Sequence, residues 1–318
     1  MTGKIMLTAA QKHEFETAGV LVVPDVVTDI LGDVRAEYAG IMDRLWHDWV
    51  AEGRVDPAIT GFEDRIIAAY RAGCEYFQPM DISLPMDQIT PDTPFHAGPA
   101  VFAMMTHPRL LDLVEDLIGP EITSNPIQHV RIKPPAPDLR ESEVRAHITA
   151  TDWHQDRGVT QEVADDTQMI TVWIAITDAT LDNGCLQAVT GAHRTELLPH
   201  CPLPQVGIPG EFIDQSRITP LPVPAGGVVV FHPMTPHASL VNKTDGIRWS
   251  FDIRFNVTGQ PTGRAQFPDF VARSRAQPET VLPDAQAWHR LWDDARMRLA
   301  ARPVTEFYRW DQDAPYCA

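Results

Sequence analysis

Thr151-Asp152-Trp153-His154-Gln155-Asp156 is the stretch of sequence that decides how the whole chain is interpreted. In an extended strand, side chains two residues apart point to the same face, so His154 and Asp156 can offer an imidazole nitrogen and a carboxylate oxygen to one metal ion. Two histidines and one carboxylate on one side of an octahedral ion form the facial triad of non-haem Fe(II) oxygenases. A single such pair is weak support in a chain with 12 histidines. The interpretation therefore depends on the residues that follow.

The strand expected over residues 247–257 has two chemically different faces. Alternation along it separates one polar set from one apolar set. The polar set is Arg248, Ser250, Asp252 and Arg254, and the apolar set is Trp249, Phe251, Ile253 and Phe255. The polar face either meets solvent, as in an ordinary amphipathic strand, or lines the interior of a barrel. In the second case Arg248 offers a planar fork of donors that suits a carboxylate.

Several motifs after the histidine-x-aspartate pair carry a family resemblance. They are Val172-Trp173-Ile174-Ala175, Asp178-Ala179-Thr180, Asn183-Gly184-Cys185-Leu186 and Gly191-Ala192-His193. His237 then precedes Arg248 by eleven residues. From about Asn125 to Asn256 the chain resembles the phytanoyl-CoA dioxygenase family of Fe(II)- and 2-oxoglutarate-dependent oxygenases. Ala192 departs from the serine that is usual in the family, at a turn that does not bear on the metal ligands.

The resemblance implies a ligand set and a cosubstrate site. The metal ligands and catalytic residues would be His154, Asp156 and His237. The spacing to Arg248 favours His237 over His232 as the third ligand, and His193 and His147 lack a partner at a suitable spacing. The residues implied for 2-oxoglutarate are Arg248, Ser239, Trp173 and Gln128, although a tryptophan at 173 is equally typical of a plain core.

The reaction implied by the resemblance consumes 2-oxoglutarate and O2, releases succinate and CO2, and hydroxylates a small molecule. Related iron halogenases have a small residue in place of the carboxylate ligand. The retained Asp156 therefore favours hydroxylation, desaturation or another oxygenase outcome. Two alternatives stay open: a cupin-type metal-dependent isomerase or lyase that uses no 2-oxoglutarate, and a noncatalytic binding protein on the same fold.

Composition limits the partners and the compartment. A net charge of -17 disfavours nucleic acid and anionic membrane surfaces, which attract clustered lysine and arginine. No run of 18 apolar residues and no signal-peptide pattern occurs, so we expect a soluble cytoplasmic protein with a small-molecule substrate. The four cysteines show no paired spacing, and we expect reduced thiols. Nothing in the composition indicates an oligomeric state.

The pattern along the chain predicts a mainly β protein with flanking helices, in the form of a double-stranded β-helix (a cupin-like jelly roll). Helices are expected from Thr8 to Ala18, from Thr28 with an apolar stripe through Trp49, from Thr106 to Leu117, and around Trp288. We expect one domain, residues 1–318. Its parts are a helical portion at about 1–121, a jelly-roll core at about 122–257 and a helical segment at about 258–318.

The substrate is not specified by these motifs. The segment over residues 134–152 is long and polar for a connection between strands, and such segments are either lids or inert insertions. Four polar side chains are candidates for contact with an anionic substrate, although each is more typical of a surface or structural position. They are Arg140, Arg157, Gln161 and Arg254.

Overall fold

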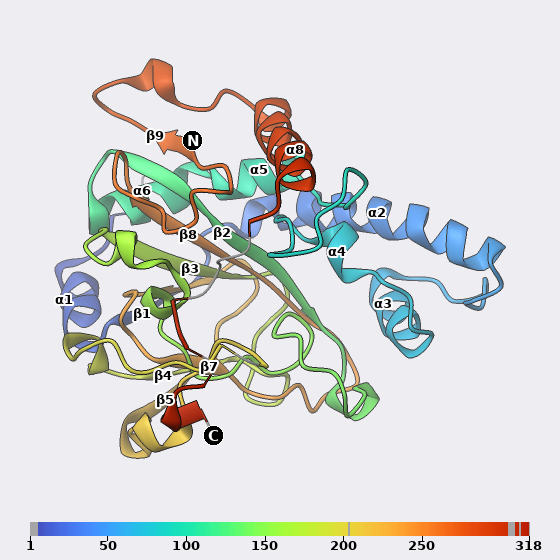
Figure 1. Cartoon of the computed structure of the whole chain (residues 1–318), viewed down its shortest axis with the longest axis horizontal. Coiled ribbons are helices and arrows are strands. Elements are labelled where there is room, and N and C mark those ends of the chain that lie inside the picture. Colours follow the sequence, from blue (N-terminus) through green and yellow to red (C-terminus); the bar gives the residue numbers. More distant parts are fainter. Residues whose placement is uncertain (1–5, 203, 305–308, 312, 318) are drawn as a thin grey trace.

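Two antiparallel sheets form the centre of the molecule, which is a computed structural model describing residues 6–202, 204–304, 309–311 and 313–317. The larger sheet has six strands, two of which, β8 and β2, cross the middle of Figure 1. In spatial order its strands are β1 (Val20–Val23), β6 (Val228–Phe231), β3 (Met169–Ala175), β8 (Arg248–Val257), β2 (Ile122–Lys133) and β9 (Phe270–Arg273). All its pairings are antiparallel.

The smaller sheet has three strands, and together the two sheets confirm the expected jelly roll with flanking helices. Its spatial order is β5 (Ile218–Leu221), β4 (Leu186–Val189) and β7 (His237–Ser239). A shared apolar cluster lies between the sheets, with Trp173 and Phe231 from the larger and Leu186 from the smaller. The amino-terminal portion supplies β1 and the carboxy-terminal segment supplies β9, so both also contribute an edge strand to the larger sheet.

Helices cover the outer face of the larger sheet and extend beyond it (Figure 1). They are α1 (Ala9–Ala18), α2 (Leu31–Ala51), α3 (Phe62–Arg71), α4 (Phe77–Met80), α5 (Pro99–Met105), α6 (Pro108–Ile118) and α8 (Ala285–Ala301). A further short helix, α7 (Asp156–Val159), begins at the buried Asp156 and does not belong to this outer layer. Within the described ranges, none of these helices has the length and apolar character needed to cross a membrane.

The ends of the first helices follow local capping chemistry. Thr8 caps α1 as expected, since its side chain accepts from the backbone N–H of Gln11 and the Gln11 side chain accepts in return. The expectation for Thr28 was wrong. Thr28 begins a short 3-10 helix, Thr28–Ile30, and α2 starts only after it, with no side-chain cap. The third predicted helix is present as α6, which begins at Pro108, two residues later than expected, and ends before Gly119, whereas the separate helix α5 ends at Met105.

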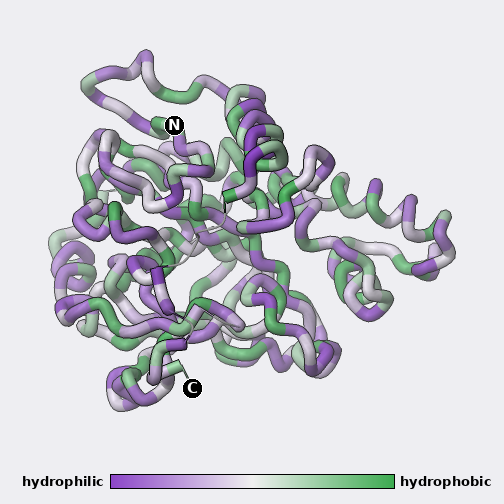
Figure 2. The backbone as a smooth tube through the Cα atoms, viewed as in Figure 1, coloured by the Kyte–Doolittle hydropathy of each residue, from purple (hydrophilic) through white to green (hydrophobic). Residues whose placement is uncertain are grey.

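The apolar face of β8 packs against the helices. Figure 2 shows hydrophobic and hydrophilic residues alternating along α2. Tyr38 on the buried side of this helix contacts Trp249 and Phe251, with ring centroids 5.1 and 5.7 Å apart. Its hydroxyl donates to the carbonyl of Met80 at 2.8 Å. Because the apolar residues of β8 are buried outward in this way, the polar residues of the strand must face the interior.

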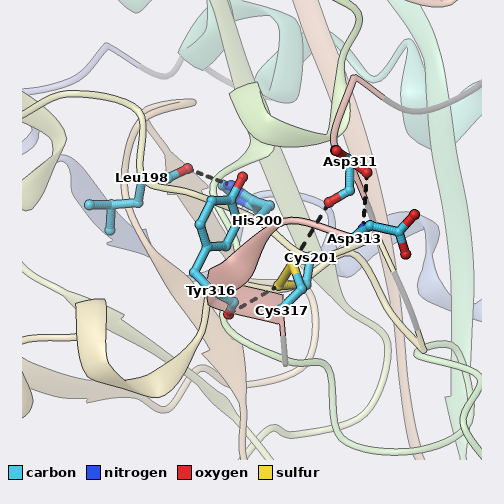
Figure 3. The surroundings of a disulfide bond; sticks show 7 residues. All are labelled: Leu198, His200, Cys201, Asp311, Asp313, Tyr316 and Cys317. Carbon is cyan, nitrogen blue, oxygen red and sulfur yellow. Dashed lines mark hydrogen bonds between the residues drawn. A yellow bond between two sulfur atoms is a disulfide. The ribbon is translucent and has the colours of Figure 1, made fainter.

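A disulfide joins Cys201 to Cys317, with their Cα atoms 5.5 Å apart. This corrects the expectation of four reduced thiols, of which Cys74 and Cys185 are free. The two bonded cysteines are 116 residues apart in the sequence, and such a pairing has no local spacing signal. Figure 3 shows the bond beside Tyr316 and His200.

The disulfide holds the end of the chain against the segment that carries His154 and Asp156. The His200 ring stacks on Trp310 with centroids 4.9 Å apart, and its Nε2 accepts from the backbone N–H of Gln155 at 2.9 Å. The Trp310 indole donates to the carbonyl of Gly158 at 2.7 Å. Trp310 therefore contacts this segment directly at Gly158 and, through the His200 ring, also supports it at Gln155.

Replacing Cys317 with serine should lower the free energy of unfolding by on the order of 2 to 4 kcal/mol, because the bond closes a long loop in the unfolded chain. Urea unfolding of the variant and of the wild-type protein measures this difference. Dithiothreitol should lower the wild-type midpoint to that of the variant and leave the variant unchanged. A wild-type midpoint that does not respond to reductant would contradict a stabilising disulfide.

Candidate metal and cosubstrate site

The polar faces of β2 and β8 lie side by side in the interior of the barrel. The register pairs Lys133 with Arg248 and, four residues along, His129 with Asp252. Arg248 is fully buried, and Arg254 is 3% exposed. The polar set of β8 therefore lines the interior of the barrel and does not face solvent. Charged side chains in such a place require partners, because burial of an unpaired charge is costly.

His154 and His237 face each other across an isolated β-bridge. The backbone N–H of each donates to the carbonyl of the other at 2.9 Å, and the two rings are 4.2 Å apart. The sequence pattern suggested that His154 and Asp156 lie on one strand. In the structure, Asp156 instead begins the short helix α7. Gln155 between them has extended backbone angles, φ -106 and ψ 135. This single extended residue is sufficient to direct both side chains to one side.

The donor atoms of these three residues converge. His154 Nε2 lies 3.8 Å from Asp156 Oδ1, and His237 Nε2 lies 3.9 Å from Asp156 Oδ2. The three ligand atoms all lie within 4.8 Å of one another, and all three residues are buried. This geometry brings together the three residues predicted as metal ligands.

Hydrogen bonds fix which nitrogen of each ring is available. His154 Nδ1 donates to the carbonyl of Asp152 at 2.8 Å, and His237 Nδ1 donates to the carbonyl of Thr235 at 3.0 Å. Each ring is thereby held with its Nε2 lone pair directed at Asp156, which is the usual way in which a protein orients metal-binding histidines. Phe231 stacks on the His237 ring at 4.2 Å and limits its rotation.

Burial and charge set the protonation of the triad. Burial, with His237 close by, lowers the pKa of His154 to about 3. Burial also lowers the pKa of His237. For Asp156 burial acts in the opposite direction, but the Arg254 guanidinium and the other groups around the carboxylate together outweigh it and hold the pKa of the carboxyl well below its usual range. At neutral pH the site therefore presents two neutral imidazoles and one carboxylate, the protonation states that bind a divalent metal.

Arg254 holds the carboxylate of the triad, a contact that the sequence pattern did not assign. Its Nη2 donates to Asp156 Oδ1, and its Nη1 donates to the carbonyl of Ile127 at 3.0 Å. Asp156 Oδ2 is buried and, among the described residues, has no hydrogen-bond partner. A buried carboxylate oxygen without a hydrogen bond, beside the Nε2 of His237, is costly unless it binds a cation. The site is therefore suited to a divalent metal ion.

Arg248 lies in the same interior with most of its donors free. Its Nη1 donates to Ser250 Oγ at 2.7 Å, whereas its buried Nε and Nη2 have no partner within the described part of the chain. The guanidinium carbon lies 5.3 Å from the centre of the Trp173 ring. Burial, with Arg131 close by, lowers the pKa of Arg248 to about 9, so the side chain remains positive at neutral pH. The guanidinium of Arg248 is therefore a buried positive group with two adjacent donors and no anionic partner for them among the described residues.

Lys133 is a second buried basic side chain at this level, and the sequence interpretation missed it. Its Nζ donates to Ser239 Oγ at 2.9 Å and to Thr151 Oγ1 at 3.0 Å. Burial and the nearby Arg248 hold the pKa of Lys133 well below its usual range. Ser239 Oγ also accepts from the backbone N–H of Thr151 at 2.8 Å. The alternation of His129, Arg131 and Lys133 along β2 was the signal that could have identified this lysine.

Other residues considered from the sequence lie elsewhere. Gln128 is buried, but its amide donates to the carbonyl of Ile82 at 2.8 Å, and the register of β2 shifts just before His129. Among the described residues, Gln128 is not one of those that line the space beside the triad. His232 pairs instead with His193, with rings 5.0 Å apart.

The arginines weighed as substrate contacts have structural partners. Arg157 donates to the carbonyls of Ala164 and Thr167. Arg140 donates to the carbonyl of Tyr70.

A larger cavity of about 290 Å³ adjoins the triad. His154, Thr151 and Arg131 line both this cavity and the small space that contains Asp156 and His237. Part of its wall comes from residues 144–147, within the segment that was weighed as a lid. A volume near 300 Å³ is at the lower end of the range for small-molecule sites.

Comparison with known proteins gives the family. Residues 15–250 match the family described as phytanoyl-CoA dioxygenase (PhyH). The peroxisomal phytanoyl-CoA dioxygenase of Homo sapiens is 27% identical over 260 residues, which cover 79% of this chain and 68% of that protein. A probable phytanoyl-CoA dioxygenase of Caenorhabditis elegans is 30% identical over 174 residues, 52% of this chain and 54% of that protein. The chain thus aligns with about half the length of the nematode relative.

Solved structures share the fold at low sequence identity. The apo form of the non-heme monooxygenase ThoJ is 18% identical, with a TM-score of 0.56 and coverage of 92% of this chain and all of that one. The apo form of EctD from S. alaskensis is 16% identical, with a TM-score of 0.51, 80% of this chain and 78% of that one. The family match covers most of the chain and includes all three converging ligand residues, and the chain therefore belongs to the phytanoyl-CoA dioxygenase family.

Proposed function

We propose that this protein is an Fe(II)- and 2-oxoglutarate-dependent dioxygenase that hydroxylates a small molecule and releases succinate and CO2. The observation that carries the proposal is the pairing of two features in one barrel interior. One is the triad of His154, Asp156 and His237, and the other is the buried guanidinium of Arg248, largely unpartnered among the described residues. The first suits a metal ion and the second suits an anion.

The triad would hold Fe(II) through His154 Nε2, His237 Nε2 and a carboxylate oxygen of Asp156. Iron bound in this way supplies the activation of O2 and the oxidation of a C–H bond, and the protein supplies position and exclusion of water. Asp152 and Thr235 keep the two rings in the metal-binding tautomer. Arg254 keeps the carboxylate ionised and oriented.

Arg248 would hold the distal carboxylate of 2-oxoglutarate. Its free Nε and Nη2 offer the paired donors that a carboxylate accepts. Lys133 adds an amine that donates hydrogen bonds, Ser239 a hydroxyl, and Trp173 an aromatic wall. The space beside the triad is about 20 Å³, room for about one water molecule. A five-carbon acid would therefore have to move the lining side chains apart as it binds.

The substrate would occupy the larger cavity and reach the metal from the His154 side. This placement follows from His154, which lines both spaces. Hydroxylation is the outcome that we propose for this chain. One structural neighbour at a TM-score of 0.50 is described as the epimerase SnoN with iron and alpha-ketoglutarate, so the shared fold supports more than one outcome. The buried Arg248 fork argues against a cupin-type enzyme without 2-oxoglutarate and against a noncatalytic binding protein.

The turnover of 2-oxoglutarate tests this proposal without knowledge of the substrate. The purified protein with Fe(II), O2 and carboxyl-labelled 2-oxoglutarate should release labelled CO2 and an equal amount of succinate slowly, by uncoupled turnover. Omission of Fe(II) or O2 should abolish both products. The variant His232→Ala should retain the activity, because His232 lies outside the triad. Iron loading without any release of succinate would contradict the proposal.

The cytoplasm remains our prediction for the compartment. The Cys201–Cys317 bond speaks against this prediction, because disulfides are rare in cytosolic proteins.

A further inference from the structure

A second cluster of ionisable side chains lies outside the triad. It consists of Asp81, His129 and His147, whose candidate donor atoms lie within 4.8 Å of one another. His129 and His147 line the larger cavity, the same cavity that His154 lines. None of the three belongs to the proposed metal or cosubstrate site. The cluster therefore faces the place where a substrate would lie.

The carboxylate of Asp81 is held in a fixed position in this cluster. Its side chain is 3% exposed, and Oδ1 accepts from the backbone N–H groups of Ile82 and Val130 at 2.9 and 3.0 Å. The other oxygen, Oδ2, accepts from His129 Nδ1 at 2.9 Å. The carboxylate is thus anchored to the backbone at one oxygen and orients an imidazole with the other.

This arrangement decides what His129 offers to the cavity. When Nδ1 carries the hydrogen that Asp81 accepts, the neutral ring has a lone pair on Nε2 and accepts hydrogen bonds there. The His129 side chain is 24% exposed and lines the cavity, so this acceptor is available to a small molecule. A carboxylate that orients a histidine in this way recurs in enzymes, where it fixes the tautomer.

His147 completes this part of the wall as an uncharged ring. It stacks on Phe77 with centroids 4.5 Å apart and lies 4.6 Å from the His129 ring. Burial and the neighbouring His129 hold the pKa of His147 well below its usual range. It belongs to residues 134–152, the segment weighed as a lid, and brings this segment against β2. The wall at this point is polar but carries no positive charge from His147.

The remaining wall does not favour an anion. Three of the arginines that line the cavity already have carboxylate partners, since Arg131 pairs with Asp252, Arg145 with Glu143, and Arg254 with Asp156. Much of the rest is apolar, with Met86, Ile127 and Phe267 among the lining residues. A neutral, mainly apolar molecule is therefore the better fit.

We propose that His129, held by Asp81, is a substrate-recognition residue that accepts a hydrogen bond from a hydroxyl or N–H group of the substrate. The substrate class is an uncharged, mainly apolar small molecule that carries such a donor. This inference rests on the proposed function only in treating the larger cavity as the substrate site. The hydrogen bond would place the donor-bearing end against β2 and leave the rest of the molecule directed toward His154.

A pair of matched ligands tests this inference by binding alone. 2-Naphthol has an O–H donor, whereas 2-methoxynaphthalene has the same rings and an oxygen that only accepts. Equilibrium dialysis under anaerobic conditions, with Fe(II) and 2-oxoglutarate present, measures both dissociation constants. The wild-type protein should bind 2-naphthol about tenfold more tightly, the effect of one net hydrogen bond. Equal affinity, or no binding of either ligand up to its solubility limit, overturns the inference.

Two variants separate recognition from general damage. His129→Phe should reduce the preference for 2-naphthol to less than about twofold and leave the affinity for 2-methoxynaphthalene nearly unchanged. Asp81→Asn should also remove the preference, because an amide that donates to Nδ1 moves the ring hydrogen to Nε2. The exposed His289→Phe is the matched control and should behave as wild type. Retention of the preference in His129→Phe contradicts the inference.

Metal analysis tests whether the cluster of Asp81, His129 and His147 binds a metal ion instead of a substrate. The protein incubated with Zn²⁺ and Fe(II) should bind the same number of metal ions per chain in the wild type and in His129→Phe. A second equivalent that disappears in His129→Phe would replace the inference with a metal site. The ligand preference does not depend on turnover. A preserved preference without any formation of succinate would therefore reject the proposed function and retain the role of His129.

Discussion

Alanine in place of His237 should abolish the turnover of 2-oxoglutarate and sharply weaken iron binding, while the fold remains intact. The reason is that His237 supplies one of only three converging ligand atoms, and no other described histidine lies within this group. His154→Ala should behave in the same way. Iron content by metal analysis, succinate formation and the melting temperature together measure the effect.

His232→Ala is the matched control for both variants. His232 lies five residues before His237, but its ring contacts His193 rather than the triad. This variant should retain its iron and its activity. Near-normal turnover with unchanged iron content in His154→Ala or His237→Ala would show that the ligand assignment is wrong.

Arg248→Ala should raise the dissociation constant of 2-oxoglutarate roughly 30-fold or more and leave iron binding nearly intact. The loss of one partner of a buried, hydrogen-bonded charge pair costs on the order of 2 to 5 kcal/mol, which corresponds to this factor or a larger one. Lysine at this position should rescue binding only in part, because an ammonium group lacks the planar fork. Anaerobic titration with 2-oxoglutarate measures the dissociation constant of the wild-type protein, of Arg248→Ala and of Arg248→Lys.

The surface variant Arg44→Ala controls for the loss of a positive charge and should bind as the wild type does. An unchanged dissociation constant in Arg248→Ala would move the cosubstrate role to another residue. Lys133 is then the first candidate, because it is the other buried basic side chain at the same level of the barrel. Arg254 is a weaker candidate, since its guanidinium already holds Asp156.

Sequence spacing was sufficient for the parts of the site that depend on strand alternation. The alternation along residues 248–257 separated the polar from the apolar set, and the packing of the apolar set against the helices then showed which of the two expected placements of Arg248 is correct. The histidine-x-aspartate pair required only that Gln155 be extended, and this held although Asp156 begins a helix. Both are short-range properties of the backbone.

Features that depend on distant contacts were beyond the sequence pattern. The pairing of Cys201 with Cys317 spans 116 residues and brings Trp310 against the segment of the metal ligands. A shift of register in β2, just before His129, directs Gln128 to Ile82. The position of Asp81 beside His129 also depends on tertiary packing, since the two residues are 48 apart.

The central claim is that one barrel interior binds Fe(II) and 2-oxoglutarate together, and a single spectroscopic measurement tests it. Anaerobic addition of Fe(II) and then 2-oxoglutarate to the apoprotein should produce a weak visible charge-transfer band that saturates at one equivalent of each per chain. The band should be absent with Fe(II) alone and absent in His237→Ala. A protein that binds iron at the triad but shows no band at saturating 2-oxoglutarate would contradict the account.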